Sequence, residues 1–322
     1  MSELMELSSS PLIPSLPDDV TVDIVARVPR SHYPTLSLVS KKFRKLIASP
    51  KLYKRRSQLG ITQHRVYALL RNRDTGDCRF YILHRKLNSR NRLVIVPSLP
   101  PVSSRGSFVS VGSKTYVFND VDALCIDCAS HTVQPIPDMP QRFSATPMPS
   151  KVANVIDGKV YVIGDSRFTS DHGMSWRKTV MVLDSETQVW EPVMKKENMR
   201  VGALWSDSVV MEDKIYLKGY MNEKALRAYD PKQSRWGVVN GLEEILASEC
   251  ALSKWPNVVK CGEKKLALFF PKKHDGKEVI CCAEIALERR QGGEVWGKLE
   301  SCDVVIEDGG LFDVVKCVAV TV

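Results

Sequence analysis

The residues of this sequence with the greatest potential for chemistry are its nine cysteines and six histidines. Cys125 and Cys128 form a CxxC pair, a spacing found in zinc sites and in redox pairs at helix starts. The stretch "ALCIDCAS" is typical of a strand, in which positions three apart point to opposite faces, so we expect neither chemistry. Cys281 and Cys282 are adjacent residues of another predicted strand. The histidines at 32, 64, 84, 131, 172 and 274 lack HxH or HxxxH spacing, so we expect no metal and no cofactor.

Other catalytic motifs are equally sparse. The sequence contains no glycine-rich phosphate loop and no nucleophile elbow. The stretch "TSDHGMSW" fits the Asp-box pattern of sialidase-type propellers, but such boxes recur and lie in a third-to-fourth hairpin, whereas this one occurs once and in another connection. We therefore expect no catalytic residues, and a propeller enzyme stays as an alternative that the metal content of the purified protein would test.

Composition indicates a globular protein that works inside the cell. The chain has 322 residues, 43% of them hydrophobic and 26% charged, and no run is long enough to span a membrane. Because the N-terminal stretch carries two glutamates and no apolar core flanked by lysine or arginine, we expect no signal peptide. An odd number of irregularly spaced cysteines indicates reduced thiols. We expect the protein in the cytoplasm, the nucleus or both, without association with membranes.

The net charge of +9 is concentrated near the N-terminus. Eight bases and no acid occur from residue 41 to residue 56: Lys41, Lys42, Arg44, Lys45, Lys51, Lys54, Arg55 and Arg56. This run is either a solvated helix face or a surface for an acidic partner. Because aromatic residues are few there and no nucleic-acid-binding signature accompanies the run, we do not expect a nucleic-acid partner.

The first sixty residues predict a small group of helices. In "LPDDVTVDIVARVP", residues 16 to 29, Ser15 is the expected cap and Pro29 the expected end. Apolar residues of this helix cover an arc of about 200°, whereas a surface helix needs about 100°. Three short helices follow, in "YPTLSLVS", "SKKFRKLIAS" and "SPKLYKRRSQLG". The surplus of apolar surface indicates a second contact outside this small domain.

Residues 11 to 58 resemble an F-box, in the Leu-Pro-Asp-Asp opening, the order of apolar and proline positions, and Phe43 where tryptophan is commoner. The resemblance implies docking on a Skp-type adaptor and through it on a cullin ligase core. It assigns adaptor contacts to Leu16, Pro17, Ile24, Val28, Pro29, Tyr33, Leu36, Val39, Ser40, Lys41, Phe43, Leu46, Ile47 and Leu52. The alternative is a helical cap on the second domain that has no partner.

The remaining chain, residues 61 to 322, repeats a four-strand pattern. Apolar strand, tight polar turn, Lys-x-Tyr and second strand recur in "SFVSVGSKTYVFND", "VANVIDGKVYVIGD" and "DSVVMEDKIYLKGY". Repeats are expected at about 61–100, 107–140, 151–196, 205–240 and 255–300. The first repeat lacks its first strand, and the apolar C-terminus, residues 311–322, is expected to supply it and close the ring.

These repeats resemble kelch repeats, although the family's glycine doublet is degenerate here. The expected fold is thus a small all-α F-box followed by an all-β kelch-type propeller of about five blades, with six possible. An F-box with degenerate kelch repeats is an arrangement typical of plants.

The lengths of the connections predict which face of the propeller binds a target. First-to-second turns are short, whereas the second-to-third segments 166–178 and 271–278 and the segments between repeats are expected to be long loops on one face. Arginine and tryptophan are enriched in binding hot spots. The candidate target contacts are Arg105, Arg142, Arg167, His172, Trp176, Arg177, Arg200, Trp205, Trp255 and His274.

The two resemblances together imply the substrate-recognition subunit of a Skp–cullin–F-box ubiquitin ligase. We expect that this chain is itself not an enzyme. The unknown target is expected to be a protein. The alternative is a kelch scaffold or interaction protein without a role in a ligase.

Overall fold

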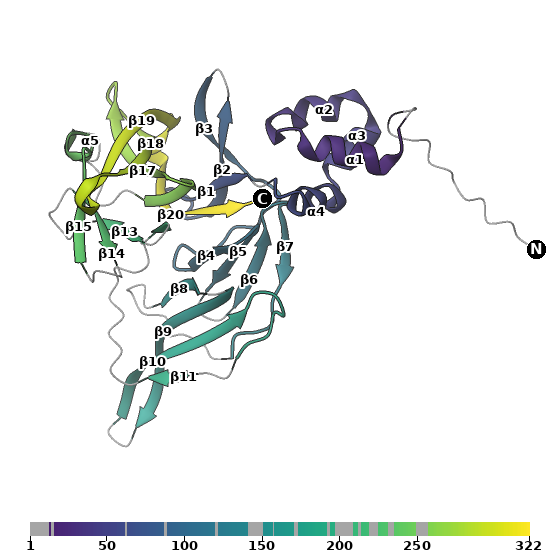
Figure 1. The fold of residues 1–322 in the computed structure, drawn as a ribbon. Helices are drawn as coiled ribbons and strands as arrows, with labels where there is room; N and C mark the ends of the chain where they lie inside the picture. The colour runs from purple at the N-terminus through teal and green to yellow at the C-terminus, as the bar shows by residue number, and fades with distance from the viewer. Residues whose placement is uncertain are drawn as a thin grey trace, which may run out of the picture. The chain divides into compact units, whose positions relative to one another are not determined.

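The computed structural model describes residues 13, 16–61, 63–86, 89–119, 122–140, 151–156, 158–170, 173–191, 194–196, 209–211, 214–218, 225–230, 235–248 and 257–322. The chain divides into two compact units (Figure 1). The helical unit contains residues 1–63 and Val322, and the β unit contains residues 64–321.

The described part of the helical unit contains four short α-helices and one 3₁₀ turn. In chain order they are α1 (Asp18–Arg27), η1 (Arg30–His32), α2 (Tyr33–Val39), α3 (Lys41–Ile47) and α4 (Pro50–Gln58). Among the described helices of the whole chain, none is long and apolar enough to cross a membrane.

Local sequence explains where these helices begin and end. The hydroxyl of Ser40 accepts a hydrogen bond from the Phe43 N–H at 3.2 Å, and Ser49 caps α4 in the same way. Gly60, just past α4, has a φ of +66°, the left-handed conformation that ends many helices. The expected cap of α1 was wrong, because the helix begins at Asp18 with Pro17 at its N-cap position and no side-chain cap bond.

The β unit contains twenty strands in its described part, arranged in four sheets. Three sheets have four strands, and the fourth has eight because two four-stranded antiparallel groups join through β15 and β19. We call each four-stranded group a blade. The eight-stranded sheet then counts as two blades, which gives five in the described part, and the sheets make a propeller-like arrangement. The expected fold class is confirmed.

The strands of blades 1 to 3 have the following bounds. Blade 1 is β20 (Phe312–Thr321), β1 (His64–Asn72), β2 (Cys78–Lys86) and β3 (Ser89–Ile95). Blade 2 is β4 (Ser107–Val111), β5 (Lys114–Phe118), β6 (Ala123–Asp127) and β7 (Thr132–Pro135). Blade 3 is β8 (Lys151–Ile156), β9 (Lys159–Ser170), β10 (Gly173–Asp184) and β11 (Met194–Lys196).

Blades 4 and 5 share the eight-stranded sheet. Blade 4 is β12 (Val209–Met211), β13 (Lys214–Lys218), β14 (Leu226–Asp230) and β15 (Arg235–Asn240). Blade 5 is β16 (Asn257–Gly262), β17 (Lys265–His274), β18 (Lys277–Arg289) and β19 (Val295–Ile306). The short helix α5 (Glu243–Ser248) follows β15, and the 3₁₀ turns η3 (Gln291–Gly293) and η4 (Gly309–Leu311) flank β19.

The C-terminal strand completes blade 1. β20 pairs antiparallel with β1 from His64–Thr321 to Asn72–Phe312. Cys317, Val318 and Val320 of β20 are buried. The first strand of blade 1 is therefore supplied by the end of the chain, which protects the edge of β1.

Two segments that the sequence analysis expected as long loops are tight hairpins instead. β9 and β10 pair through the segment 166–178, as far as Ser170 and Gly173. β17 and β18 pair as far as His274 and Lys277, and the two residues between them, Asp275 and Gly276, have φ values of 49° and 77°. Positive φ at both central residues is the geometry of a type I′ turn, for which Asp-Gly is a favoured sequence.

Apolar side chains connect neighbouring blades. One cluster of buried residues joins blade 4 to blade 5, a second joins blade 5 to blade 1, and a third joins blade 2 to blade 3. Blade 1 contacts blade 2 through Phe80 and Phe108, whose ring centroids lie 6.3 Å apart. Since each sheet has two apolar faces, each blade is stabilised by its neighbours more than by itself.

A tyrosine on the second strand of one blade binds the third-to-fourth turn of the next. The Tyr67 hydroxyl donates to the Cys128 carbonyl at 3.0 Å and lies 2.7 Å from His131 Nε2. The single phenolic proton serves one of these two contacts. When it goes to the carbonyl, the bond to His131 is donated by the protonated Nε2 of the ring.

The same arrangement recurs between blades 2 and 3. The Tyr116 hydroxyl donates to the Ser185 carbonyl at 3.4 Å and accepts from Gln188 Nε2 at 2.8 Å. His131 and Gln188 occupy the same place in their turns and both have positive φ, 56° and 58°. At Tyr116 the Lys-x-Tyr signature of the sequence therefore corresponds to a contact between blades. Tyr67, which has Arg65 in place of the lysine, makes the same contact.

In blades 2 and 3 an aspartate shapes the turn that receives this tyrosine. The Asp127 carboxylate accepts from the Ala129 N–H at 2.8 Å, and Asp184 accepts from the Glu186 and Thr187 N–H groups at 2.8 and 2.9 Å. These backbone bonds, with Thr187 the largest contributor, lower the pKa of Asp184. The aspartate thus organises the turn whose carbonyl accepts the tyrosine proton.

We predict that Tyr67→Phe lowers the free energy of unfolding by about 1–3 kcal/mol, because it leaves the buried Cys128 carbonyl without this donor. Urea denaturation followed by near-ultraviolet circular dichroism measures the change. His131→Gln is the matched control and should change stability by less than about 0.5 kcal/mol, because Gln188 already plays this part between blades 2 and 3. Unfolding of Tyr67→Phe at the wild-type midpoint would contradict the account.

Candidate functional site

The helical unit keeps one apolar face for its own core. Val22 and Val25 of α1 are buried against α3 and α4, together with Ala26, Tyr33, Phe43, Leu46 and Leu52. The Tyr33 hydroxyl donates to the Val25 carbonyl at 3.1 Å. The unit therefore has a complete small core before any partner is considered.

Arg56 fixes the end of α1 from inside this core. Its guanidinium donates to the carbonyl oxygens of Ala26 at 2.6 Å and Val28 at 2.9 Å, and to the Tyr33 hydroxyl at 3.2 Å. The last carbonyl groups of a helix lack partners within the helix and are negatively polarised, so a buried cation is stabilising there. One base of the basic run is thus a structural residue.

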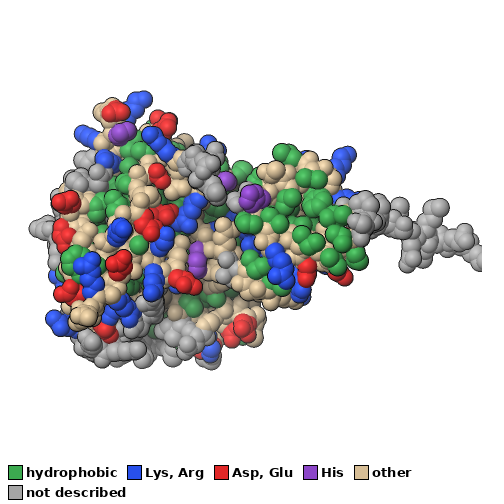
Figure 2. Space-filling view, turned by 45° about the horizontal axis from the view of Figure 1, so that its top comes forward, with side chains coloured by type: hydrophobic (Ala, Val, Ile, Leu, Met, Phe, Trp, Pro, Cys, Tyr) green, Lys and Arg blue, Asp and Glu red, His purple; other side chains and the backbone are tan. Residues whose placement is uncertain are grey.

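A second apolar face of the same unit is exposed. On α1, Val20 is 43% exposed and Ile24 is 46% exposed. At the end of α2, Leu38 is 77% exposed and Val39 is 65% exposed. Figure 2 shows hydrophobic side chains gathered over the helical unit. We call Val20, Ile24, Leu38 and Val39 the outer apolar surface.

The predicted adaptor contacts divide between these two faces. Tyr33, Phe43, Leu46 and Leu52 are buried in the core of the unit, so in this structure they support the surface and do not form it. The other predicted contacts are half-buried or exposed: Leu16, Pro17, Ile24, Val28, Pro29, Leu36, Val39, Ser40, Lys41 and Ile47. Burial of one side of α1 and exposure of the other agree with the apolar arc that the sequence shows.

Sequence reasoning missed two members of the outer apolar surface, Val20 and Leu38. A signal for each was present, because Val20 lies on the apolar arc of α1 and Leu38 on the apolar positions of α2. Helical spacing alone did not show that their side chains point outward, since that depends on how α1 and α2 pack on α3 and α4.

Ion pairs use two further bases of the basic run. Lys51 Nζ lies 2.8 Å from Asp19, and Arg55 donates to both oxygens of Asp23, with Nη2 to Oδ2 at 2.7 Å. Lys41, Arg44, Lys45 and Lys54 are exposed and make no ion pair with the residues that the structure describes. The helical unit therefore presents free positive charge as well as apolar surface.

Two family models match the sequence. The F-box domain model matches residues 13–55, and the FKB95 kelch-repeats domain model matches residues 67–227 and 220–306. An F-box/kelch-repeat protein of Arabidopsis thaliana is 39% identical over 363 residues, which cover 96% of this chain and 94% of that protein.

The chain belongs to the F-box/kelch-repeat family.

Further relatives agree. A putative F-box/kelch-repeat protein of the same plant is 34% identical, with 95% of each chain covered, and a kelch repeat-containing protein is 32% identical, with 95% of this chain and 86% of that protein covered. The β-propeller domain of a Trilobed protease from Pyrococcus furiosus matches with 12% identity and a TM-score of 0.31, covering 76% of this chain and 95% of that domain, and this likeness supports no conclusion.

Membership of the family gives the helical unit a general role. F-box domains bind Skp-type adaptors in general, and F-box/kelch-repeat proteins are typically adaptor subunits and not enzymes.

Among the described residues there is no group of three or more His, Cys, Asp or Glu side chains that could hold a metal ion. Burial raises the pKa of the Cys128 thiol to about 12, so at neutral pH this half of the CxxC pair is protonated.

The predicted target contacts are only partly visible. Arg105 is exposed between β3 and β4, and His274 is exposed at the end of β17. Arg167 and Trp176 are register partners in the β9–β10 hairpin, next to Arg177. Outside the described residues lie Arg142, His172, Arg200, Trp205 and Trp255.

We predict that Arg55→Met raises the pKa of Asp23 towards its ordinary value. In the wild type the two hydrogen bonds from Arg55 lower this pKa, so the pair stabilises the helical unit above the unfolded pKa of Asp23 and loses its effect as the pH falls through the lowered folded value. A carboxyl titration by NMR measures the shift. Lys51→Met is the control, because Lys51 pairs with Asp19, and an equal shift in both variants would contradict the assignment.

Proposed function

We propose that this chain is the substrate-recognition subunit of an SCF-type ubiquitin ligase. Its F-box docks on a Skp-type adaptor and thereby on a cullin core, and the β unit binds a target protein. In this role the transfer chemistry belongs to other subunits, and the chain raises the effective concentration of the target near the ubiquitin-charged enzyme. Such a complex acts in the cytoplasm or the nucleus.

The observation that supports the proposal most is the outer apolar surface. A unit of about fifty residues gains little stability from its own core, and exposing four large aliphatic side chains has no benefit for an isolated cap. Covering such a side chain contributes about 1.5–3 kcal/mol. A partner that covers several of them would therefore be held firmly, and the free bases beside them favour a partner with acidic groups.

For the target we propose the face of the β unit formed by its second-to-third turns and the connections between blades. Arg105 and His274 are exposed there, and we propose the same role for Arg142, Arg167, His172, Trp176, Arg177, Arg200, Trp205 and Trp255. Two of the segments proposed for this face, 166–178 and 271–278, contain paired hairpin strands and are not long loops.

We predict that Val20→Asp and Ile24→Asp each weaken binding to a purified Skp-type adaptor by about ten- to a hundredfold, because each places a charge in the covered surface. Isothermal titration calorimetry with the full chain measures this. The matched control is Leu299→Asp on β19, since Leu299 and Val20 are both 43% exposed, and it should bind as the wild type does.

Two results would contradict the proposal. If the wild-type chain fails to bind any Skp-type adaptor, the helical unit is a cap and a kelch scaffold without a ligase role takes its place. If Val20→Asp and Ile24→Asp bind like Leu299→Asp, the outer apolar surface is not the docking surface.

A further inference from the structure

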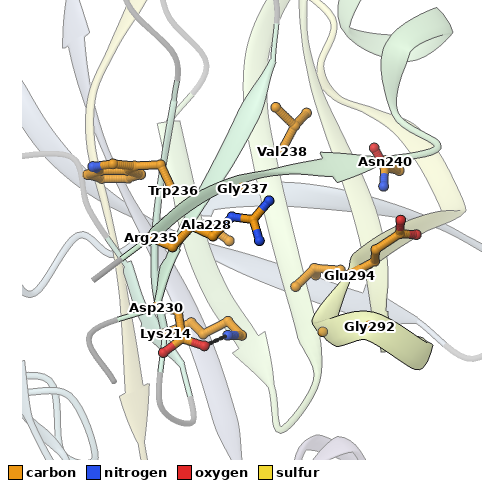
Figure 3. A pocket seen from close by; sticks show the side chains of 12 residues that line it. Lys214, Ala228, Asp230, Arg235, Trp236, Gly237, Val238, Asn240, Gly292 and Glu294 are labelled. Carbon is orange, nitrogen blue, oxygen red and sulfur yellow. Dashed lines mark hydrogen bonds and ion pairs between the residues drawn. The ribbon is translucent and has the colours of Figure 1, made fainter. Parts of the chain in front are cut away.

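A cavity of about 270 Å³ lies between blades 4 and 5 of the β unit. Its walls come from β15 on one side and from the connection between β18 and β19 on the other, as Figure 3 shows. Its floor contains Lys214 and Asp230, which are paired with each other at 2.5 Å.

The cavity exists because two strands separate. β15 pairs in parallel with β19 only at Val239–Val295 and Asn240–Trp296. Three and two residues before Val295, Gly292 and Gly293 have φ values of 83° and 79°, which no regular strand adopts, so the pairing with β15 does not continue through them. We call the space between Arg235–Val238 and Gly292–Glu294 the fork.

The separation leaves one edge of β15 without a strand. Residues Arg235 to Val238 pair with β14 on their other side and are all exposed. No described strand pairs with them on the side of the fork. An exposed strand edge offers N–H and C=O groups that an added strand satisfies.

The charges of the fork favour one kind of added strand. Figure 3 shows the Arg235 guanidinium directed into the space between β15 and Glu294. Arg235 makes no ion pair with the described residues, whereas Glu294 accepts from the Trp296 indole at 3.0 Å. The guanidinium is thus the free donor of the fork, and its planar geometry suits a carboxylate.

Apolar surface flanks this donor. Trp236 and Val238 are 45% and 41% exposed, and in a strand they point to the face opposite to Arg235. A strand added beside β15 also alternates its side chains between the two faces. One acidic residue would therefore meet Arg235 while the apolar residues on either side of it cover Trp236 and Val238.

We propose that the fork binds an extended peptide segment of a partner protein, in which one acidic residue lies between two apolar residues, by adding it as a strand to the edge of β15. The site lies where β14 and β18 end and β15 begins, next to the third-to-fourth turns. The proposed target face is at the opposite end of these strands. The proposal does not rest on docking to an adaptor.

The test measures binding of the fluorescein-labelled peptide STVEVTS by fluorescence anisotropy, with STVQVTS as the neutral control peptide. The full chain is titrated into each peptide up to about 1 mM. We expect STVEVTS to bind, and STVQVTS to bind at least about fivefold more weakly because it lacks the charge-assisted bond. Arg235→Glu and Val238→Lys should each weaken binding of STVEVTS at least tenfold, by reversing the charge and by blocking the edge.

The matched control is Val133→Lys. Val133 lies on β7, the last strand of blade 2, and is 41% exposed like Val238, but no fork adjoins it. Its binding should equal that of the wild type. Hydrogen exchange of the Arg235–Val238 amides should slow when the peptide is bound.

The proposal is overturned if the wild-type chain does not bind STVEVTS in this range. It is also overturned if Arg235→Glu, Val238→Lys and Val133→Lys bind equally well. Because all three substitutions are at exposed positions, matching melting temperatures will separate loss of binding from loss of fold.

Discussion

A four-stranded sheet has two faces, and in this β unit a face is buried from solvent only where a neighbouring blade covers it. The contact that fixes their spacing is the tyrosine hydroxyl of one blade in the third-to-fourth turn of its neighbour, seen at Tyr67 and again at Tyr116. A buried phenol must be satisfied, and a turn carbonyl together with a side-chain N–H satisfies it completely. Between blades 1 and 2 and between blades 2 and 3, these hydrogen bonds therefore set the register, and buried apolar side chains stabilise the contact.

The helical unit differs from the β unit, because it leaves part of its apolar surface exposed. Its core closes with Arg56 holding the end of α1, yet Val20, Ile24, Leu38 and Val39 stay in water. The buried Arg56 guanidinium donates three hydrogen bonds within the unit, whereas these four aliphatic side chains have no described apolar neighbour that covers them. The chain belongs to the F-box/kelch-repeat family, and F-box domains in general bind Skp-type adaptors.

Much of this was readable from the sequence, because it is local or periodic. The apolar arc of α1, the caps Ser40 and Ser49 and the first strand supplied by residues near the C-terminus depend on spacing and composition alone. What depends on packing was not readable. The exposure of Val20 and Leu38 follows from how the helices meet, and the parallel contact of β15 with β19 joins residues more than fifty positions apart. The Asp-Gly pair at 275–276 was visible in the sequence, but the segment 271–278 around it was expected to be a long loop.

The measurement that tests the central claim most directly is methyl cross-saturation NMR on the full chain, with labelled Val, Ile and Leu methyl groups and an unlabelled Skp-type adaptor. The account predicts saturation transfer to Val20, Ile24, Leu38 and Val39 and none to Val22, Val25, Leu46 and Leu52, whose side chains stay in the core. Transfer to the core methyl groups, or to none of the eight residues, would contradict the claim that the outer apolar surface docks on the adaptor.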